Sequence, residues 1–409
     1  MGGTVKSLDA VFDPKRNALN VLRLVLAALV IVSHAWIIGG YGYPPSIAGV
    51  DIGMFAVCGF FAISGYLITG SRLASAPSAG RATGTPFAGV SRPSQADLHT
   101  RSEDRPAVLS TRAQKARARL DQRVHPAVVS TGGKSARRLD QRGVPGLAPF
   151  LLRRFLRIYP AFLTVLIVTA VIFAPLSTLL GTTDTPAPSS SSAASYVFAN
   201  LSLHITQWGI DGTLLTARTP TWNIPLWSLV FEALCYLGLG LLASVVPRRF
   251  FRISALTLFA ALTLATLLTT DGGTAGFTDN LLALGSFFFG GVVLYLFRQR
   301  MPASAPLALI AAALVALILA LGFFKPLAAF PLAYLLIYLG AVLPLARLAA
   351  RNDISYGLYV YGFPVQQLLL LATIPFALAS WFLVERPALR FKRFAAPSPS
   401  RHTPAPAFR

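Results

Sequence analysis

The chain has 409 residues, of which 54% are hydrophobic and 12% charged, and its mean hydropathy is +0.61. A soluble core does not need this much apolar surface, so the composition excludes an ordinary soluble enzyme and indicates an all-α, polytopic transmembrane helical bundle. The net charge of +21 does not indicate nucleic acid, because its Lys and Arg lie mainly in residues 72–146 and in short loops, where anionic membrane lipids are the expected partner.

Apolar runs along the chain predict about ten membrane spans, or nine if the last stretch forms a single helix. The first nine lie near residues 19–39, 52–70, 159–180, 223–246, 253–270, 277–297, 305–322, 327–345 and 354–371. The last stretch is too long for one ordinary span and too short for two. We therefore expect a tight turn at residues 373–375 and a short returning segment near 374–386. The positive-inside rule then places both termini in the cytoplasm.

Residues 73–147 differ in composition, being rich in Ala, Arg, Ser, Gly and Pro, and they contain an imperfect repeat at 105–123 and 125–142. Such a segment cannot bury enough apolar area to offset its ordering entropy. We predict a disordered, low-complexity cytoplasmic insertion, with binding to anionic lipid as the alternative. The expected organisation is two spans in 1–72, the insertion in 73–147, the remaining spans in 148–394 and a disordered cytoplasmic tail in 395–409.

Two ionisable residues lie in the first span, "LNVLRLVLAALVIVSHAW" (19–36). Eleven residues at about 100° per residue give a rotation about 20° larger than three full turns. Arg23 and His34 therefore share one helix face, about 16 Å apart in depth. An ionisable group at mid-membrane costs roughly 2.5–3.5 kcal/mol and usually faces a polar interior. With the amino terminus inside, Arg23 lies near the cytoplasmic surface and His34 in the outer half of the bilayer. A snorkelling arginine and a histidine hydrogen-bonded to a neighbouring helix are the structural alternative.

Two acidic residues are expected at the depth of His34. Glu232 lies in "PLWSLVFEALCYL" (225–237), and Asp51 opens "GVDIGMFAVCGFFAISGYL" (49–67). A carboxylate can orient a buried histidine and stabilise its imidazolium form, which makes the histidine a candidate general base. His34, Glu232 and Asp51 are therefore the candidate catalytic residues.

The cytoplasmic side has a basic cluster. "RRFLRIYP" (153–160) places Arg154 and Arg157 about one turn apart at a membrane entrance, where Arg23 and Arg72 can join them. Guanidinium groups suit polyanionic phosphates, whereas the alternative role of each arginine is a positive-inside anchor.

These segments together resemble the acyltransferase 3 family. The resemblance rests on the Arg–ten residues–His helix, "GVD…FFAISGYLIT", "RRFLRIYP", "PLWSLVFEALCY", "DISYGLYVYGFPVQQ" (353–367) and "SWFLVERPALR" (380–390), which fall in family order. It implies a bacterial integral membrane enzyme that O-acylates extracytoplasmic glycans. It also implies that His34 is the essential base with Arg23 as its helix partner, and that Arg154 and Arg157 belong to a motif linked to acyl-CoA. Glu232 matches the first glutamate of the family's Trp-Ser-Leu-x-x-Glu segment.

The chain departs from the family pattern in three respects. Ala233 stands where many members have a second acid, and Gly362 stands where many have a histidine. The C-terminal pair of spans is shorter, and the loop at 73–147 longer, than the pattern implies. A degenerate, non-catalytic copy is therefore one alternative.

We expect an O-acyltransferase of the bacterial inner membrane that moves an acetyl or other acyl group from cytoplasmic acetyl-CoA or acyl-CoA, without a metal. The expected acceptor is a hydroxyl of an extracytoplasmic carbohydrate or glycolipid, such as an exopolysaccharide or O-antigen. A flippase or transporter of a lipid-linked glycan is the alternative from another class. The expected CoA-binding residues are Arg23, Arg72, Arg154 and Arg157, and the expected substrate contacts are Trp227, Ser228 and Tyr236.

Two details of this expectation concern the reacting groups and the acceptor. Ser228 or Tyr236 is the expected oxyanion stabiliser. The outer segment 181–222 carries Trp208 and Trp222, whose rings can stack on sugars.

Overall fold

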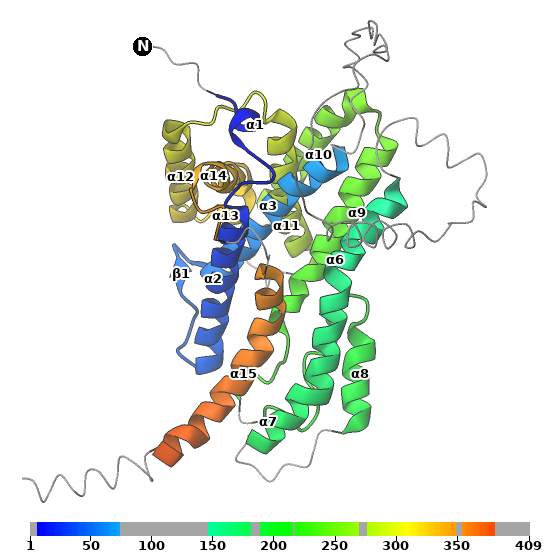
Figure 1. Ribbon diagram of the computed structural model, residues 1–409, viewed down its shortest axis with the longest axis vertical. Coiled ribbons are helices and arrows are strands. Elements are labelled where there is room, and N and C mark those ends of the chain that lie inside the picture. Colours follow the sequence, from blue (N-terminus) through cyan, green and yellow to red (C-terminus); the bar gives the residue numbers. More distant parts are fainter. Residues whose placement is uncertain are drawn as a thin grey trace, which may run out of the picture. The chain divides into compact units, whose positions relative to one another are not determined.

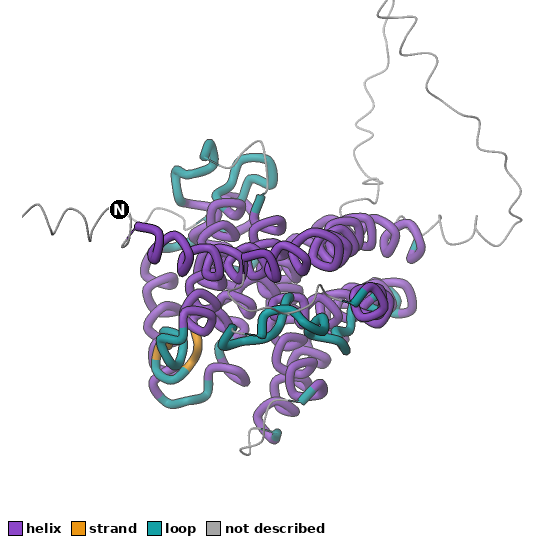
Figure 2. The backbone as a smooth tube through the Cα atoms, turned by 90° about the horizontal axis from the view of Figure 1, so that it is seen from below, coloured by secondary structure: helices purple, strands orange, loops and turns teal. Residues whose placement is uncertain are grey.

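The computed structural model describes residues 6–73, 146–180, 189–215, 217–269, 276–348 and 354–380, with side chains as far as residue 369. These residues form a helical bundle with one short strand pair (Figures 1 and 2). The predicted helical class is therefore confirmed. The predicted insertion lies outside the described residues except at its two ends, and so does the predicted tail 395–409.

The elements follow the predicted apolar runs closely in the first part of the chain. They are α1 (Leu8–Val11), α2 (Leu19–Gly39), the antiparallel strands β1 (Ser46–Ile47) and β2 (Val50–Asp51), and α3 (Ile52–Leu73). The middle part contains α6 (Leu147–Val168), the π-helical turn η1 (Thr169–Phe173), α7 (Ala174–Leu180), α8 (Ser190–Asn200), the 3-10 turn η2 (Ile224–Ser228) and α9 (Leu229–Val245).

The last part contains α10 (Arg248–Leu268), α11 (Phe277–Phe297), α12 (Ala305–Ala320), α13 (Phe324–Leu327), α14 (Ala329–Val342) and α15 (Ser355–Ser380). Within the described part of the chain, six helical segments are long and apolar enough to cross a membrane, and α12 and α14 are shorter apolar helices. The chain is therefore a multi-pass membrane protein.

The third span was predicted to begin near residue 159, but its helix begins at Leu147. Pro149 lies in the first turn of α6, where its missing N–H would have no helical partner in any case. Pro160 lies inside the helix, and its carbonyl accepts a hydrogen bond from Thr164 Oγ1 at 2.8 Å. The basic segment 153–157 is therefore helical and continuous with the span.

The turn predicted at residues 373–375 is wrong, because α15 continues through it to Ser380. Its 26 residues extend about 39 Å at 1.5 Å each, which exceeds the roughly 30 Å of a bilayer core. Proline is more frequent in membrane helices than in soluble ones, so Pro375 is a weaker turn signal here than in a soluble protein. Figure 1 places the carboxyl ends of α2 and α15 toward the same lower end, away from α1.

The helices α3 and α11 form the centre of the bundle. In each of them 72% of the most apolar window is buried, compared with 17% in α10. Glycines allow the two backbones to touch, since a Cβ at Gly65 would lie 1.9 Å from the Phe288 carbonyl oxygen, and one at Gly291 would lie 2.1 Å from that of Ala62. Small residues at such crossings are typical of helix packing in membranes.

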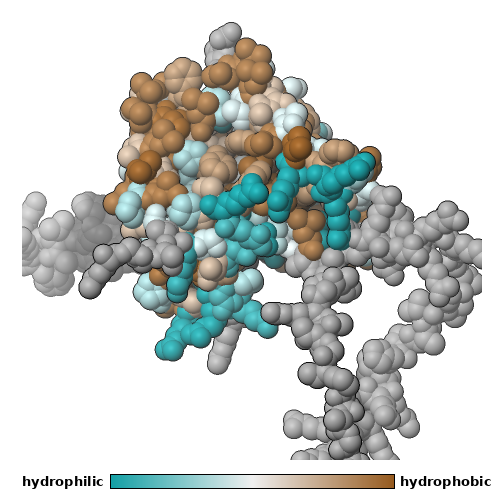
Figure 3. Space-filling model, turned by 90° about the horizontal axis from the view of Figure 1, so that it is seen from above, coloured by the Kyte–Doolittle hydropathy of each residue, from teal (hydrophilic) through white to brown (hydrophobic). Residues whose placement is uncertain are grey.

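The sides of the bundle expose large apolar side chains, among them Ile253 and Leu264 of α10 and Leu309 of α12. The end that carries the amino-terminal segment instead shows a band of hydrophilic residues between apolar flanks (Figure 3). Apolar sides with a polar end are what a bundle in contact with lipid requires.

Candidate functional site

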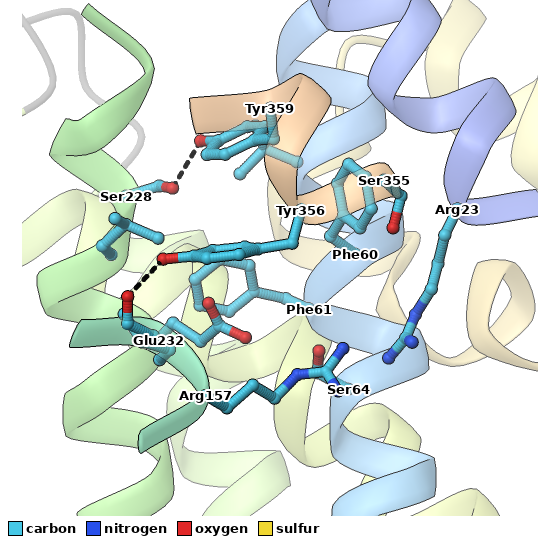
Figure 4. Close-up of a pocket in the computed structure, with 13 residues that line it drawn as sticks. Arg23, Phe60, Phe61, Ser64, Arg157, Ser228, Glu232, Ser355, Tyr356 and Tyr359 are labelled. Carbon is cyan, nitrogen blue, oxygen red and sulfur yellow. Dashed lines mark hydrogen bonds between the residues drawn. The ribbon is translucent and has the colours of Figure 1, made fainter. Parts of the chain in front are cut away.

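A pocket lies among α2, α3, α6, η2, α9 and α15 (Figure 4). Its accessible volume is about 60 Å³, which has room for a few water molecules or a narrow chain but not for a nucleotide. Its polar lining residues are Arg23, Ser64, Arg157, Ser228, Glu232, Ser355, Tyr356 and Tyr359. Segments far apart in the sequence therefore supply one polar cavity inside an apolar bundle.

Two arginines from different helices point into this pocket. Arg23 lies in the second turn of α2, and Arg157 lies on α6, which is already helical there because it begins at Leu147. Their guanidinium groups approach the cavity from opposite sides (Figure 4). Glu232 is the one acidic residue of the lining, so the ionised groups around the cavity carry an excess of positive charge.

Glu232 lies with the arginines and not with His34, which corrects the expected arrangement. The chain enters the bundle through η2, where Pro225, Leu226 and Ser228 are buried, so the first turn of α9 is already inside. Tyr236, one turn further along α9, donates a hydrogen bond from its hydroxyl to Glu232 Oε1. The carboxylate of Glu232 is therefore held by its own helix beside the cationic pocket.

The proton of the Ser228 hydroxyl can be assigned from its surroundings. Tyr359 Oη donates to the Pro225 carbonyl at 2.7 Å and also lies 2.6 Å from Ser228 Oγ. A phenol has a single proton, so the Ser228 hydroxyl must donate to Tyr359. Ser228 then presents only lone pairs to the pocket, which does not suit the expected role of oxyanion stabiliser in this arrangement.

The sequence argument missed Tyr356 and Tyr359. Tyr356 Oη donates to the Ile158 carbonyl at 2.7 Å, which fastens α15 to α6 across the pocket (Figure 4). The two tyrosines lie three residues apart in "SYGLYVY", on one face of an apolar helix. That spacing was the available signal.

His34 lies with Asp51, as predicted. Asp51 Oδ1 accepts hydrogen bonds from Ser33 Oγ at 2.7 Å and from the backbone N–H of Gly53 at 2.9 Å. The second bond satisfies an N–H in the first turn of α3, where a carboxylate is favourable. Asp51 is also close enough to His34 to interact with it electrostatically. The short hairpin β1–β2 therefore brings an acidic helix cap next to the histidine.

The imidazole of His34 is half-buried and packs edge-on against Phe363, with ring centroids 5.2 Å apart and planes at 90°. His34 is not among the residues that line the pocket. Tyr359 lines the pocket, and Phe363 follows it by one turn on α15. Along α15, the buried Phe363 therefore lies one turn from the lining residue Tyr359 and in ring contact with His34.

The contact of α15 with α2 is held by a polar side chain that the sequence argument also missed. Gln366 Nε2 donates to the carbonyl of Ile31 at 2.8 Å. Ile31 lies three residues before His34 on α2. A Cβ at Gly362 would lie 3.1 Å from Ile31 Cγ1, so this glycine lies close to α2. Neighbouring glutamines in an apolar helix, Gln366 and Gln367, were the sequence signal.

Arg72 and Arg154 lie outside the pocket lining. Arg72 is buried, donates to the Gly146 carbonyl and to Ser244 Oγ, and stands over the ring of Phe150. Arg154 donates to Ser71 Oγ at 2.7 Å and also lies over the Phe150 ring, 5.7 Å from its centroid. These contacts join the end of α3 to α6 and α9, so both arginines have a structural role.

The remaining predicted substrate contacts, Trp227 and Tyr236, are also absent from the lining. Trp227 packs edge-on against Phe231, and the Tyr236 hydroxyl is used by Glu232. Within the described residues, no group of three His, Cys, Asp or Glu side chains is placed to hold a metal ion. Cys58 and Cys235 are free and buried.

Comparison with protein families matches the chain to an acyltransferase domain of the acyltransferase 3 type, over residues 16–88 and 139–385. The matched ranges include α2, α6, η2, α9 and α15, which carry the pocket and His34. Comparisons with curated proteins and with solved structures find no match.

Proposed function

The chain belongs to the acyltransferase 3 family and is a membrane acyltransferase, and from this premise we propose that it moves an acyl group from cytoplasmic acyl-CoA to a hydroxyl of an extracytoplasmic glycan. His34 is the general base in this proposal, and Asp51 is its charge partner. The enzyme resides in the bacterial inner membrane with its amino terminus in the cytoplasm.

The observation that carries the proposal is the convergence of Arg23 and Arg157 on one small cavity (Figure 4). Two guanidinium groups that line one cavity favour an anionic ligand, and guanidinium is well suited to phosphate. The cavity is too small for a nucleotide. We therefore propose that the arginines hold phosphate groups at its mouth while the narrow pantetheine arm of CoA enters.

The reaction then requires one proton to be moved twice. His34 accepts the proton of the acceptor hydroxyl as the hydroxyl oxygen attacks the thioester carbonyl. The tetrahedral intermediate collapses with cleavage of the C–S bond, and the imidazolium returns the proton to the CoA sulfur. The products are an ester and free CoA. Asp51 stabilises the imidazolium between these steps.

In this scheme the thioester meets His34 at the end of the pocket marked by Tyr359 and Phe363. Phe363 packs edge-on against the imidazole. Its ring has to rotate or shift to admit the thioester, which restricts hydrolysis of acyl-CoA when no acceptor is bound.

The test uses full-length protein in lipid nanodiscs with acetyl-CoA and polysaccharide from the host envelope. Release of CoA thiol and mass of the acetylated glycan are measured together. His34→Gln is expected to lower turnover by about 10²–10⁴-fold, the usual contribution of a general base, with the protein still folded. Arg157→Gln is expected to raise the KM for acetyl-CoA, with a smaller effect on kcat.

Arg249→Gln is the matched control, since Arg249 is an exposed arginine at the start of α10, outside the pocket. It is expected to leave both constants unchanged. Glycan transport without release of CoA thiol would favour a flippase and overturn the proposal. Unchanged turnover in His34→Gln would remove the assignment of the base.

A further inference from the structure

A second, larger pocket lies in the segment between α7 and η2, where α8 and the chain after it fold together. Its volume is about 830 Å³, and it is formed by the first part of α8 and by residues 206–220. The lining combines the hydroxyl of Ser195, the amide of Gln207, the exposed carboxylate of Asp211 and the indole of Trp208. The reaction scheme proposed above does not use this pocket.

The polar wall of the pocket is fixed by internal hydrogen bonds. Gln207 Oε1 accepts from Ser195 Oγ at 2.8 Å, and Gln207 Nε2 donates to the carbonyls of Ser192 and Gly209 at 3.2 and 3.1 Å. The buried Asn200 side chain donates to the Gln207 carbonyl and accepts from the Gln207 N–H. A ligand would therefore meet a preorganised surface, which lowers the entropic cost of binding.

The two tryptophans of this segment have different roles. Trp222 is fully buried, and its Nε1 donates to Thr213 Oγ1 at 3.0 Å, so it cannot stack on a sugar as expected. Its backbone N–H donates to the Trp208 carbonyl at 2.9 Å and thereby fixes the backbone at Trp208. Trp208 is 36% exposed and lines the pocket. One buried tryptophan thus supports one accessible tryptophan.

An accessible aromatic ring beside hydroxyl, amide and carboxylate groups matches the chemistry of a carbohydrate. The apolar face of a sugar ring packs on an indole, while its hydroxyls donate to carboxylate and amide oxygens. The hydroxyl, amide and carboxylate groups beside Trp208 therefore favour a carbohydrate as the ligand.

The chain that forms this pocket continues into the segment that lines the inner pocket. Gln367 of α15 donates to the carbonyls of Thr219 and Thr221 at 2.8 and 2.9 Å. Asn223 follows and donates a hydrogen bond to the hydroxyl of Tyr196 on α8. The chain then forms η2, which ends at Ser228. A glycan held in the outer pocket would therefore lie on the same segment that enters the reactive cavity.

We propose that this pocket, with Trp208 and Asp211 as its principal contacts, is the docking site of the glycan acceptor. The acceptor role rests on the proposed function, whereas glycan binding at Trp208 can be measured without it.

The experiment is calorimetric titration of polysaccharide from the host envelope into full-length protein in nanodiscs, with empty nanodiscs as the blank. Trp208→Ala is expected to weaken binding about 10-fold, the factor that corresponds to about 1.4 kcal/mol of lost contact energy. Trp208→Tyr is expected to retain most of the affinity because it keeps an aromatic face. Phe198→Ala is the matched control, since Phe198 is a more exposed aromatic residue of α8 outside the pocket.

A second measurement separates this inference from the proposed function. Trp208→Ala is expected to raise the KM for the glycan while leaving CoA release without acceptor unchanged. Glycan binding that depends on Trp208 in a protein without acyl transfer to the glycan would support the site and overturn the proposed function. Equal effects of Trp208→Ala and Phe198→Ala on glycan affinity would overturn the docking site. So would a Trp208→Ala variant that loses thermal stability in nanodiscs but keeps its affinity.

Discussion

Asp51 combines a structural role with a proposed chemical role. Its carboxylate bonds the first turn of α3 and Ser33 of α2, and it also acts electrostatically on His34. The first role needs only an oxygen acceptor, whereas the second needs a negative charge. Asparagine supplies the acceptor without the charge, and alanine supplies neither.

Asp51→Asn is therefore expected to keep the melting temperature and to lower turnover, because the imidazolium of His34 loses its charge partner. Asp51→Ala is expected to lose turnover and also about 1 kcal/mol of stability, the usual value for a helix cap. Turnover and thermal unfolding in nanodiscs measure the two effects. Ser33→Ala is the control for the hydrogen bond alone. Full turnover in Asp51→Asn would leave Asp51 with its structural role only.

Hydrogen bonds between polar side chains also fix the segment between α7 and η2. Asn223 Nδ2 donates to the hydroxyl of Tyr196, a buried residue of α8. Burial raises the pKa of the Tyr196 phenol, so the hydroxyl stays protonated at all ordinary pH values. This bond does not change with pH in the physiological range, which suits a structural contact next to the proposed acceptor site.

Among the helices, the contact of α3 with α11 depends on glycine. The atoms that a Cβ would meet at Gly65 and Gly291 are backbone oxygens, which cannot move aside as a side chain can. Gly238 of α9 provides a contrast, because a Cβ there would lie 4.0 Å from the nearest atom, Phe289 Cζ. Substitution of Gly65 or Gly291 by alanine tests the close packing of the two helices, whereas substitution of Gly238 by alanine tests only the helix propensity of the residue.

Gly291→Ala is expected to destabilise the protein by at least about 1–3 kcal/mol, the usual cost of overpacking, because α3 and α11 must move apart. Gly238→Ala is expected to be neutral or to stabilise slightly, since alanine favours a helix over glycine. Thermal unfolding of both variants in the same detergent measures the difference. Equal melting temperatures would show that the two helices do not touch as described.

For the whole molecule, the carboxyl end of α3 lies next to the amino end of α6, although residues 74–145 separate them in the sequence. Arg72 at the end of α3 donates to the carbonyl of Gly146, immediately before α6. A short connection can therefore join the two helices. The family match also passes over residues 89–138.

Replacement of residues 75–144 by ten Gly/Ser residues, which span about 17 Å, is expected to leave acyl transfer unchanged. If the replaced segment is flexible, the shorter loop is expected to stabilise the protein by at most about 2 kcal/mol. Expression, melting temperature and turnover are compared with those of the full chain. Loss of turnover in a folded variant would assign the segment a role in the reaction.

The sequence by itself determined the helical membrane class, most helix positions and the residues worth testing. Apolar runs of fixed length are a local property, so α2, α3 and α11 appear close to where they were predicted. The motif order was enough to predict the family, which the match over 16–88 and 139–385 confirms. Helix ends near proline were less certain, because α6 and α15 tolerate prolines that would end a soluble helix.

Only the tertiary structure decided which polar residues belong together. Asp51 lies with His34 because a hairpin brings the start of α3 beside α2. Glu232 lines the same pocket as Arg157 because η2 carries the chain inside before α9 begins. The depth of a side chain depends on where its segment enters the bundle, and that depends on contacts between residues far apart in the sequence. The separation of buried Trp222 from accessible Trp208 has the same physical reason.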